Sequence, residues 1–145
     1  QEAVGRMIRD PNASVALSDA GAHLTFFCDA GFGLHLMGHW ARDLGVLSLA
    51  DAIHELTAKP ASIFRIPKRG LIRKGYFADL LLFDPEKIDR GPKRRVRDLP
   101  GGGPRLTTDG VGLHGVWVNG QMIAQSSGLV PGAVRPGKLL REFDA

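Results

Sequence analysis

The stretch Val15-Ala16-Leu17-Ser18-Asp19-Ala20-Gly21-Ala22-His23 decides how the fold of this 145-residue chain is predicted. A short apolar run over residues 15–17 ends in an acid, several small residues and a histidine. This order is typical of a buried strand in a parallel α/β barrel, because the residues just beyond the carboxyl end of such a strand face the substrate. The sequence therefore predicts a buried strand at 15–17 and singles out Asp19 as a candidate catalytic residue.

The segments around this strand are predicted to be helical. Apolar residues recur at helical spacing, and turn residues separate the periodic segments. Gly45 suits the left-handed position that follows a helix, Ser48 suits an N-cap, and Pro60 suits the start of a further helix. The expected helices cover residues 2–9, 34–44, 48–58 and 61–66.

The second part of the chain changes to short apolar or β-branched runs separated by glycine, proline and asparagine. Asn119-Gly120 is the strongest hairpin signal, because both residues accept the positive φ of a tight primed turn. The boundary between α/β and all-β character is expected within residues 59–70. The predicted strands are 71–72, 80–83, 115–118 and 122–124.

Composition is that of an ordinary globular protein, with 43% hydrophobic and 23% charged residues. The sequence contains no apolar run of about 18 residues and no secretory leader, so we expect a cytoplasmic protein with no membrane partner. Cys28 is the only cysteine, which excludes an internal disulfide. Its neighbours Phe26 and Phe27 favour a packing role over that of a reactive thiolate.

The net charge of +4 owes much to a basic run of Lys93, Arg94, Arg95 and Arg97. A basic patch attracts polyanions, but this run has no interleaved aromatic residue and lies among prolines and glycines. We therefore expect a solvated loop and no nucleic-acid partner.

Two histidines lie four residues apart on the predicted second helix and share a face. His35 and His39 have the spacing of helical zinc motifs, but the glutamate that makes such a motif specific is missing. Packing is the favoured role for both.

Six motifs are spread along most of the chain. They are Ser18-Asp19-Ala20-Gly21-Ala22-His23, Leu56-Thr57-Ala58-Lys59-Pro60-Ala61, Gly70-Leu71-Ile72-Arg73-Lys74-Gly75-Tyr76-Phe77-Ala78-Asp79-Leu80, Asp98-Leu99-Pro100-Gly101-Gly102, Val116-Trp117-Val118-Asn119-Gly120 and Pro136-Gly137-Lys138-Leu139-Leu140-Arg141. Together they resemble the carboxyl end of the amidohydrolase superfamily, and most closely its branch of N-acyl-D-amino-acid deacylases. The resemblance implies that residues 1–66 hold the last strand and helices of a (β/α)8 TIM barrel, with its eighth strand ending at Asp19. It also implies that residues 67–145 form the carboxyl-terminal part of a small β-sandwich.

The resemblance also implies a chemistry. In such enzymes a zinc-bound hydroxide attacks the amide carbonyl, and the aspartate after strand eight moves a proton from the nucleophile to the departing nitrogen. Asp19 matches that aspartate. The superfamily's metal ligands come mainly from earlier strands, so this chain is expected to hold zinc poorly by itself, with Asp19 at most a weak ligand, and to be inactive alone.

Two further residues are expected to bind substrate. Gly21 would act through a turn conformation closed to other residues, and His23 would contact a substrate carboxylate or support Asp19. The alternatives are a structural loop histidine at His23 and a turn-capping acid at Asp19.

The predicted function is therefore part of a metal-dependent amidohydrolase that cleaves a linear amide, such as the acyl group of an N-acyl-D-amino acid. The alternative is a noncatalytic binding or assembly module. The chain begins at Gln1 and neither half looks complete, so we expect a fragment that self-associates or pairs with a missing amino-terminal part.

Overall fold

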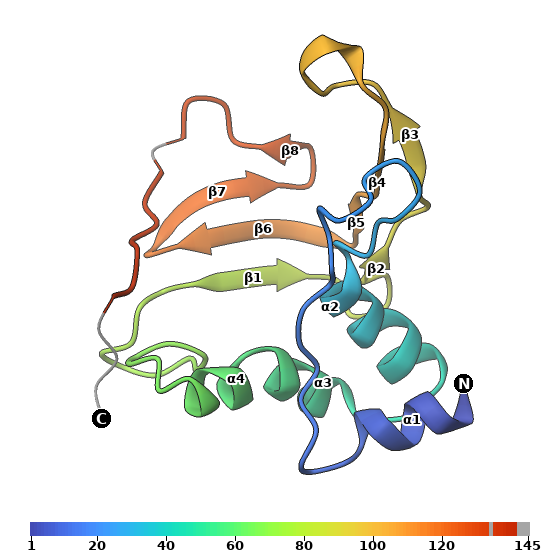
Figure 1. Cartoon of the computed structure of the whole chain (residues 1–145). Coiled ribbons are helices and arrows are strands. Elements are labelled where there is room, and N and C mark those ends of the chain that lie inside the picture. The colour runs from blue at the N-terminus through green and yellow to red at the C-terminus, as the bar shows by residue number, and fades with distance from the viewer. Residues whose placement is uncertain (134, 142–145) are drawn as a thin grey trace.

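The chain folds as a helical part followed by a part made of strands (Figure 1). The computed structural model describes residues 1–133 and 135–141. The helices are α1 Glu2–Ile8, α2 Phe32–His35, the π-helix η1 Leu36–Asp43, α3 Leu49–Leu56, α4 Ala58–Ile63 and the 3-10 turn η2 Pro100–Gly102. The strands are β1 Leu80–Phe83, β2 Asp89–Arg90, β3 Arg94–Val96, β4 Arg105–Thr107, β5 Gly110–Val111, β6 Leu113–Val118, β7 Gln121–Gln125 and β8 Gly128–Leu129.

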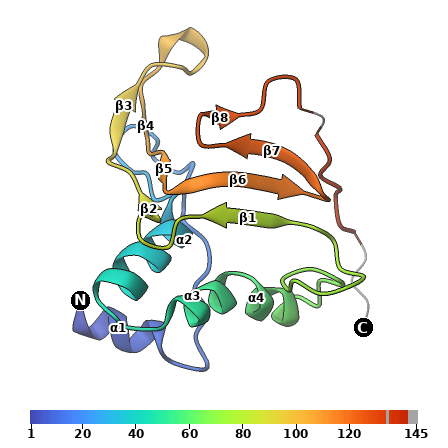
Figure 2. The ribbon, with the colours of Figure 1, turned by 180° about the vertical axis from the view of Figure 1, so that it is seen from behind.

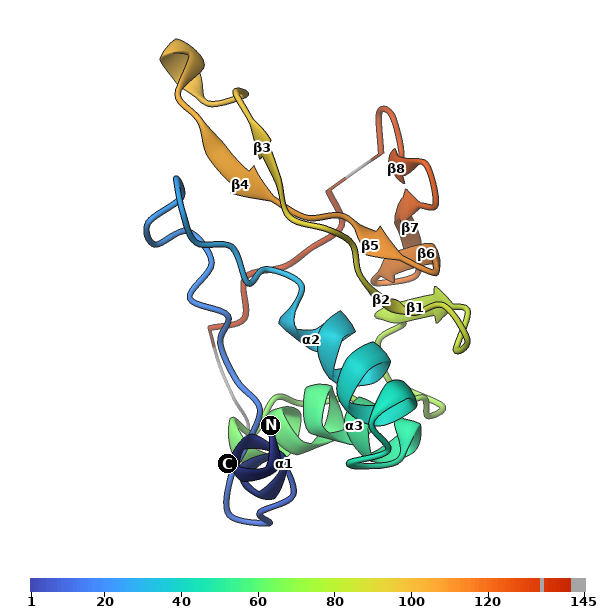
Figure 3. The same ribbon diagram turned by 90° about the vertical axis from the view of Figure 1, so that its right-hand side faces the viewer.

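The strands form one main sheet and two small ladders. The main sheet is antiparallel in the order β1-β6-β7-β8, and helices α1, α3 and α4 lie below it in the views of Figure 1 and Figure 2. Strand β2 pairs with β5, and β3 pairs with β4. Figure 3 shows that β3 and β4 extend as an arm away from the helices.

Local sequence signals set several element limits as expected. The side chain of Ser48 accepts a 3.0 Å hydrogen bond from the amide of Asp51 and so caps α3. Gly45 follows η1 with a φ of 58°. Asn119 and Gly120 have φ values of 49° and 80° and join β6 to β7, which confirms the hairpin.

The core lies where η1 and α3 meet the strand part. The buried side chains that contact one another are Leu36, Met37, Ala41, Ala52 and Ile88, and Trp40 packs against them. Gly38 permits this packing, because a Cβ there would overlap the carbonyl oxygen of Ile88. Cys28 is also buried, in agreement with its predicted packing role.

Two predicted strands are wrong. Residues 15–17 are irregular and Leu17 is 82% exposed, while Leu71 lies in a bend and the irregular Ile72 is 93% exposed. A strand exists only through hydrogen bonds to a neighbouring strand, and no described segment pairs with either run. Apolar character alone therefore did not make these segments strands.

The predicted limits of two helices also need correction. The helix expected at 34–44 begins at Phe32 and becomes a π-helix from Leu36. The helix expected at 61–66 spans Ala58–Ile63 instead, with Pro60 inside its first turn, where proline leaves no helical hydrogen bond unmade.

The basic run is exposed to solvent as expected, but part of it is a strand and not a loop. Arg94 and Arg95 belong to β3, and the Arg94 guanidinium forms 3.0 and 3.1 Å hydrogen bonds with the carboxylate of Asp109. Residues 94–96 are a strand because they pair with β4, and the sequence of the run alone did not indicate this pairing.

The change from helices to strands falls between Ile63 and Leu80, and assignment of the two parts to a barrel and a sandwich stays a prediction. Large apolar side chains are exposed on both parts, including Leu17, Ile72 and Leu129. Within the described ranges, no helix has the length and apolarity needed to cross a bilayer.

Candidate functional site

Asp19 begins a surface loop that leads to helix α2. Its side chain is exposed, and its φ is 52°, in the left-handed region that non-glycine residues seldom adopt. The carbonyl oxygen of Asp19 accepts a 3.2 Å hydrogen bond from the amide of Ala22, which closes a turn. Residues held in such conformations cluster at functional sites, so the backbone of Asp19 is compatible with its predicted role.

The two predicted substrate-binding residues lie in the same loop. His23 has a φ of 49°, and its ring stacks on Phe26 with centroids 5.0 Å apart. No described hydrogen bond joins His23 to the carboxylate of Asp19. Gly21 has a φ of 101°, which glycine adopts readily. Their assignment to substrate binding stays a prediction.

A cavity of about 320 Å³ is bordered by Ser18 and Asp29, on either side of residues 19–28. Its wall includes Ser18, the residue before Asp19, but Asp19 itself is not among the lining residues. Apolar side chains supply most of the wall, and Asp29, His35 and Arg90 bring charge or hydrogen-bonding groups to it. The apolar members are Ile8, Val15, Leu17, Phe32, Leu36 and Trp40.

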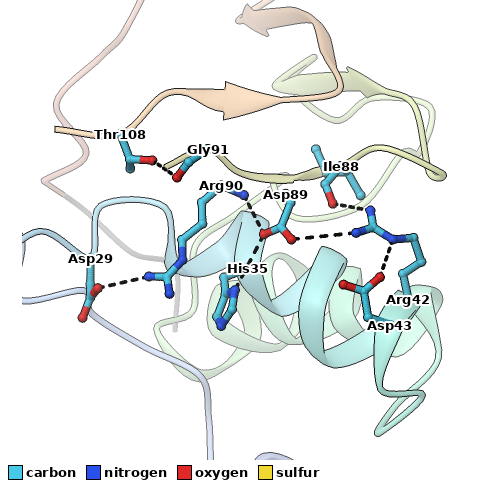
Figure 4. A network of polar contacts seen from close by, with 9 residues as sticks. All are labelled: Asp29, His35, Arg42, Asp43, Ile88, Asp89, Arg90, Gly91 and Thr108. Atoms are coloured by element: carbon cyan, nitrogen blue, oxygen red, sulfur yellow. Dashed lines mark hydrogen bonds and ion pairs between the residues drawn. The ribbon is translucent and has the colours of Figure 1, made fainter. Parts of the chain in front are cut away.

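The end of the loop is tied to the strand part by Asp29 (Figure 4). One carboxylate oxygen of Asp29 lies 3.1 Å from the Arg90 guanidinium and 3.0 Å from the Lys93 ammonium. The hydrogen bond from Lys93, helped by the charges of Lys93 and Arg90, lowers the pKa of Asp29 despite partial burial. Asp29 is therefore ionised at neutral pH.

A second polar cluster continues this network along η1. Nδ1 of His35 lies 3.6 Å from Asp89, and Arg42 donates a 2.7 Å hydrogen bond to the carbonyl oxygen of Ile88. Burial, with the charges of Arg90 and His39, lowers the pKa of His35, although Asp89 opposes the shift. His35 is therefore neutral at pH 7.

His35 and His39 do lie together, as the sequence predicted. Their rings stack with centroids 4.7 Å apart and an angle of 4° between their planes. In the part of the chain that the structure describes, no three His, Cys, Asp or Glu side chains gather as metal ligands would. A catalytic zinc needs about three protein ligands, so the described residues do not fit a zinc site by themselves.

Nothing in the sequence alone predicts the group formed by Asp29, Arg90 and Lys93. Asp29 lies 61 residues from Arg90 and 64 from Lys93, and the composition of the basic run predicts side chains free in solvent. No local motif links such distant residues, so only the folded chain shows them as partners.

Comparisons with known proteins place these observations in a family. The sequence model of a family described as "Amidohydrolase family" matches residues 2–124 of this chain. The N-acyl-D-aspartate deacylase of Alcaligenes xylosoxydans xylosoxydans is 38% identical over 104 residues, which are 72% of this chain and 19% of that protein. The D-aminoacylase of the same organism is 36% identical over 90 residues, which are 62% of this chain and 17% of that protein.

A solved structure is also similar. It is the N-acyl-D-glutamate deacylase of Bordetella bronchiseptica, complexed with zinc and a phosphonate inhibitor that mimics the tetrahedral intermediate of the reaction. The match has a TM-score of 0.61 and 31% identity, and covers 77% of this chain and 21% of that one. The chain thus spans about a fifth of the length of these relatives.

Proposed function

This chain belongs to the amidohydrolase family, and on that premise we propose that it forms part of an enzyme that removes the acyl group from N-acyl-D-amino acids. The similarity to N-acyl-D-aspartate deacylase and to D-aminoacylase supports this substrate class. Because the chain spans about a fifth of those relatives, the remaining segments of the active enzyme would come from outside these 145 residues.

Asp19 is the proposed catalytic residue. An amide resists hydrolysis because its nitrogen is a poor leaving group until it is protonated. The Asp19 carboxylate would accept the proton of the attacking water and deliver it to the leaving nitrogen. The observation that carries this assignment is the position of Asp19 within the segment that matches the family. There its side chain is exposed, on a loop in which Asp19, Gly21 and His23 have positive φ.

The neighbouring residues would contribute to substrate binding. Gly21 would let the loop backbone turn close to the substrate, and His23 would offer its ring to the substrate carboxylate. Both residues are exposed to solvent, as contact with a small-molecule substrate requires.

Zinc is the proposed cofactor of the complete enzyme, and its ligands would lie mainly outside this chain. The described residues supply no group of three ligands, and the similar N-acyl-D-glutamate deacylase is complexed with zinc. The part assigned to this chain is therefore proton transfer and not metal binding.

The test is the complete enzyme with and without Asp19→Asn. Release of free amino acid from N-acyl-D-aspartate, N-acyl-D-glutamate and N-acyl-D-leucine should exceed release from the L-enantiomers. Asp19→Asn should lower kcat by about 10²- to 10⁴-fold, the usual contribution of a positioned acid–base group. Asp10→Asn, which changes an exposed acid on the other side of residues 15–17, is the matched control and should keep activity.

Two outcomes would overturn the proposal. Absence of hydrolysis of every N-acyl-D-amino acid by the unaltered enzyme would remove the substrate class. Full activity of Asp19→Asn would remove the catalytic role of Asp19 while leaving the substrate class intact.

A further inference from the structure

The loop that carries Asp19 is held by the strand part at two places. The amide of Leu106 in β4 donates a 2.8 Å hydrogen bond to the carbonyl oxygen of Leu24. Further along the loop, Asp29 accepts hydrogen bonds from Arg90 at 3.1 Å and from Lys93 at 3.0 Å. Both attachments join residues of the loop to residues far away in the sequence, so neither is set by local structure.

We propose that Asp29 is a positioning residue, which holds the loop of Asp19 in its working place by binding Arg90 and Lys93. The inference rests on the proposed catalytic role of Asp19. Asp29 does not itself touch the reacting atoms in this proposal, and it acts only through the loop.

The geometry around Arg90 supports a fixed attachment. A Cβ added to Gly31 would lie 2.7 Å from Cβ of Arg90, so the backbone just after Asp29 passes directly against β2. Gly31 thereby brings the Asp29 carboxylate within reach of the guanidinium. On the other side, the Lys93 ammonium lies 5.8 Å from the ring centroid of Phe27, a second contact between the same two segments.

The loop between Asp19 and Asp29 has internal hydrogen bonds that would transmit a displacement. The amide of Ala22 bonds to Asp19, and the amides of Phe26 and Phe27 both bond to the carbonyl oxygen of His23 at 3.0 Å. A segment closed into successive turns moves as a unit more readily than an extended chain does. A shift of Asp29 would therefore reach Asp19.

The energetics separate positioning from general stability. The side chains of Asp29, Arg90 and Lys93 are 35%, 29% and 39% exposed, and ion pairs this accessible contribute little to folding. Proton transfer, in contrast, is sensitive to a displacement of about 1 Å, which can cost about 100-fold in rate. Loss of the Asp29 contacts should thus reduce turnover far more than it reduces stability.

The experiment compares Asp29→Asn, Asp29→Glu and a control in the complete enzyme. Asp109→Asn is the matched control, because Asp109 forms a bidentate pair with Arg94, the residue after Lys93, and is more exposed than Asp29. Asp29→Asn should lower kcat by roughly 10- to 100-fold, with KM, zinc content and melting temperature nearly unchanged. Asp29→Glu should recover part of the lost kcat, and Asp109→Asn should lose none.

Hydrogen exchange gives a readout that does not need activity. Backbone amides of residues 20–28 should exchange faster in Asp29→Asn than in the unaltered protein, while amides of η1 should not change. The combination Asp29→Asn with Lys93→Gln should cost less than the sum of the single changes, because both remove the same contact.

The outcomes distinguish this inference from the proposed function. Unchanged loop exchange in Asp29→Asn overturns the inference, whether or not the enzyme is a deacylase. An unchanged kcat, or a loss of kcat that matches a loss of folded protein, overturns it as well. Inactivity of the unaltered enzyme towards all N-acyl-D-amino acids overturns the proposed function instead.

Discussion

Lys59 at the start of α4 donates a hydrogen bond from Nζ to the backbone carbonyl oxygen of Ala13, which lies 46 residues earlier in the chain. The same ammonium lies 2.8 Å from Glu55. The side chains of Lys59 and Glu55 are only 17% and 15% exposed, so this pair fastens the segment before Asp19 to the helices.

Lys59→Met should destabilise the protein by about 1–3 kcal/mol, because it leaves the Ala13 carbonyl and the Glu55 carboxylate without their partner. Urea unfolding measures the change. Arg6→Gln is the matched control, since Arg6 and Glu2 form an exposed pair at the same spacing and their loss should cost less than about 1 kcal/mol. Equal losses in the free energy of unfolding for the two substitutions would show that burial of the Lys59–Glu55 pair does not add to its contribution to stability.

Gly38→Ala should destabilise the protein by about 1–3 kcal/mol through overpacking. A Cβ at Gly38 would meet the backbone oxygen of Ile88 and lie 2.7 Å from Cγ of Asp89, and backbone cannot give way as a flexible side chain can. Gly33→Ala, in the same helical run, would meet only Leu56 at 3.4 Å and should gain up to about 1 kcal/mol from helix propensity. Thermal unfolding of both variants should show melting temperatures shifted in opposite directions.

Stability should fall as the pH drops below about 6.5, the ordinary pKa of a histidine, because folding lowers the pKa of His35. The unfolded chain then binds a proton at His35 that the folded chain binds less readily, so acid favours unfolding. The cause is burial of His35 together with the nearby charges of Arg90 and His39.

His35→Gln should flatten this dependence between pH 7 and pH 5, measured as the free energy of unfolding in urea. His54→Gln, which changes an exposed histidine on α3, should leave it unchanged. A slope that survives in His35→Gln would assign the effect to another group.

The 145-residue chain alone should bind zinc weakly and show no deacylase activity. Its described residues bring together no three metal ligands, and a catalytic zinc needs about that number. Isothermal titration with zinc, with an assay on N-acyl-D-aspartate alongside, checks both statements. Tight one-to-one binding accompanied by turnover would contradict them.

The isolated chain should also self-associate, because large apolar side chains such as Leu17, Ile72 and Leu129 are 82%, 93% and 81% exposed. Sedimentation velocity should show species larger than the monomer. The fraction of these larger species should fall when Ile72→Gln and Leu129→Gln are combined. A single monomeric species with cooperative thermal unfolding would contradict the expectation that this exposed apolar surface drives self-association.

Part of the fold follows from residues that are close in sequence. Ser48 with Asp51 caps α3, and Asn119-Gly120 makes the β6–β7 turn, because each depends on the φ angles and hydrogen bonds of adjacent residues. The same holds for β1, whose apolar run was recognised at its observed limits. The family resemblance, and with it the choice of Asp19, also came from contiguous motifs.

Tertiary structure decided what contiguous residues could not. The run at residues 15–17 had the composition of a strand, yet it has no pairing partner among the described residues and stays irregular. Conversely, β2 and β3 have only two and three residues and become strands because β5 and β4 pair with them. Capping and turn formation are local, whereas strand pairing and the binding of Asp29 to Arg90 and Lys93 depend on which distant segments the fold brings together.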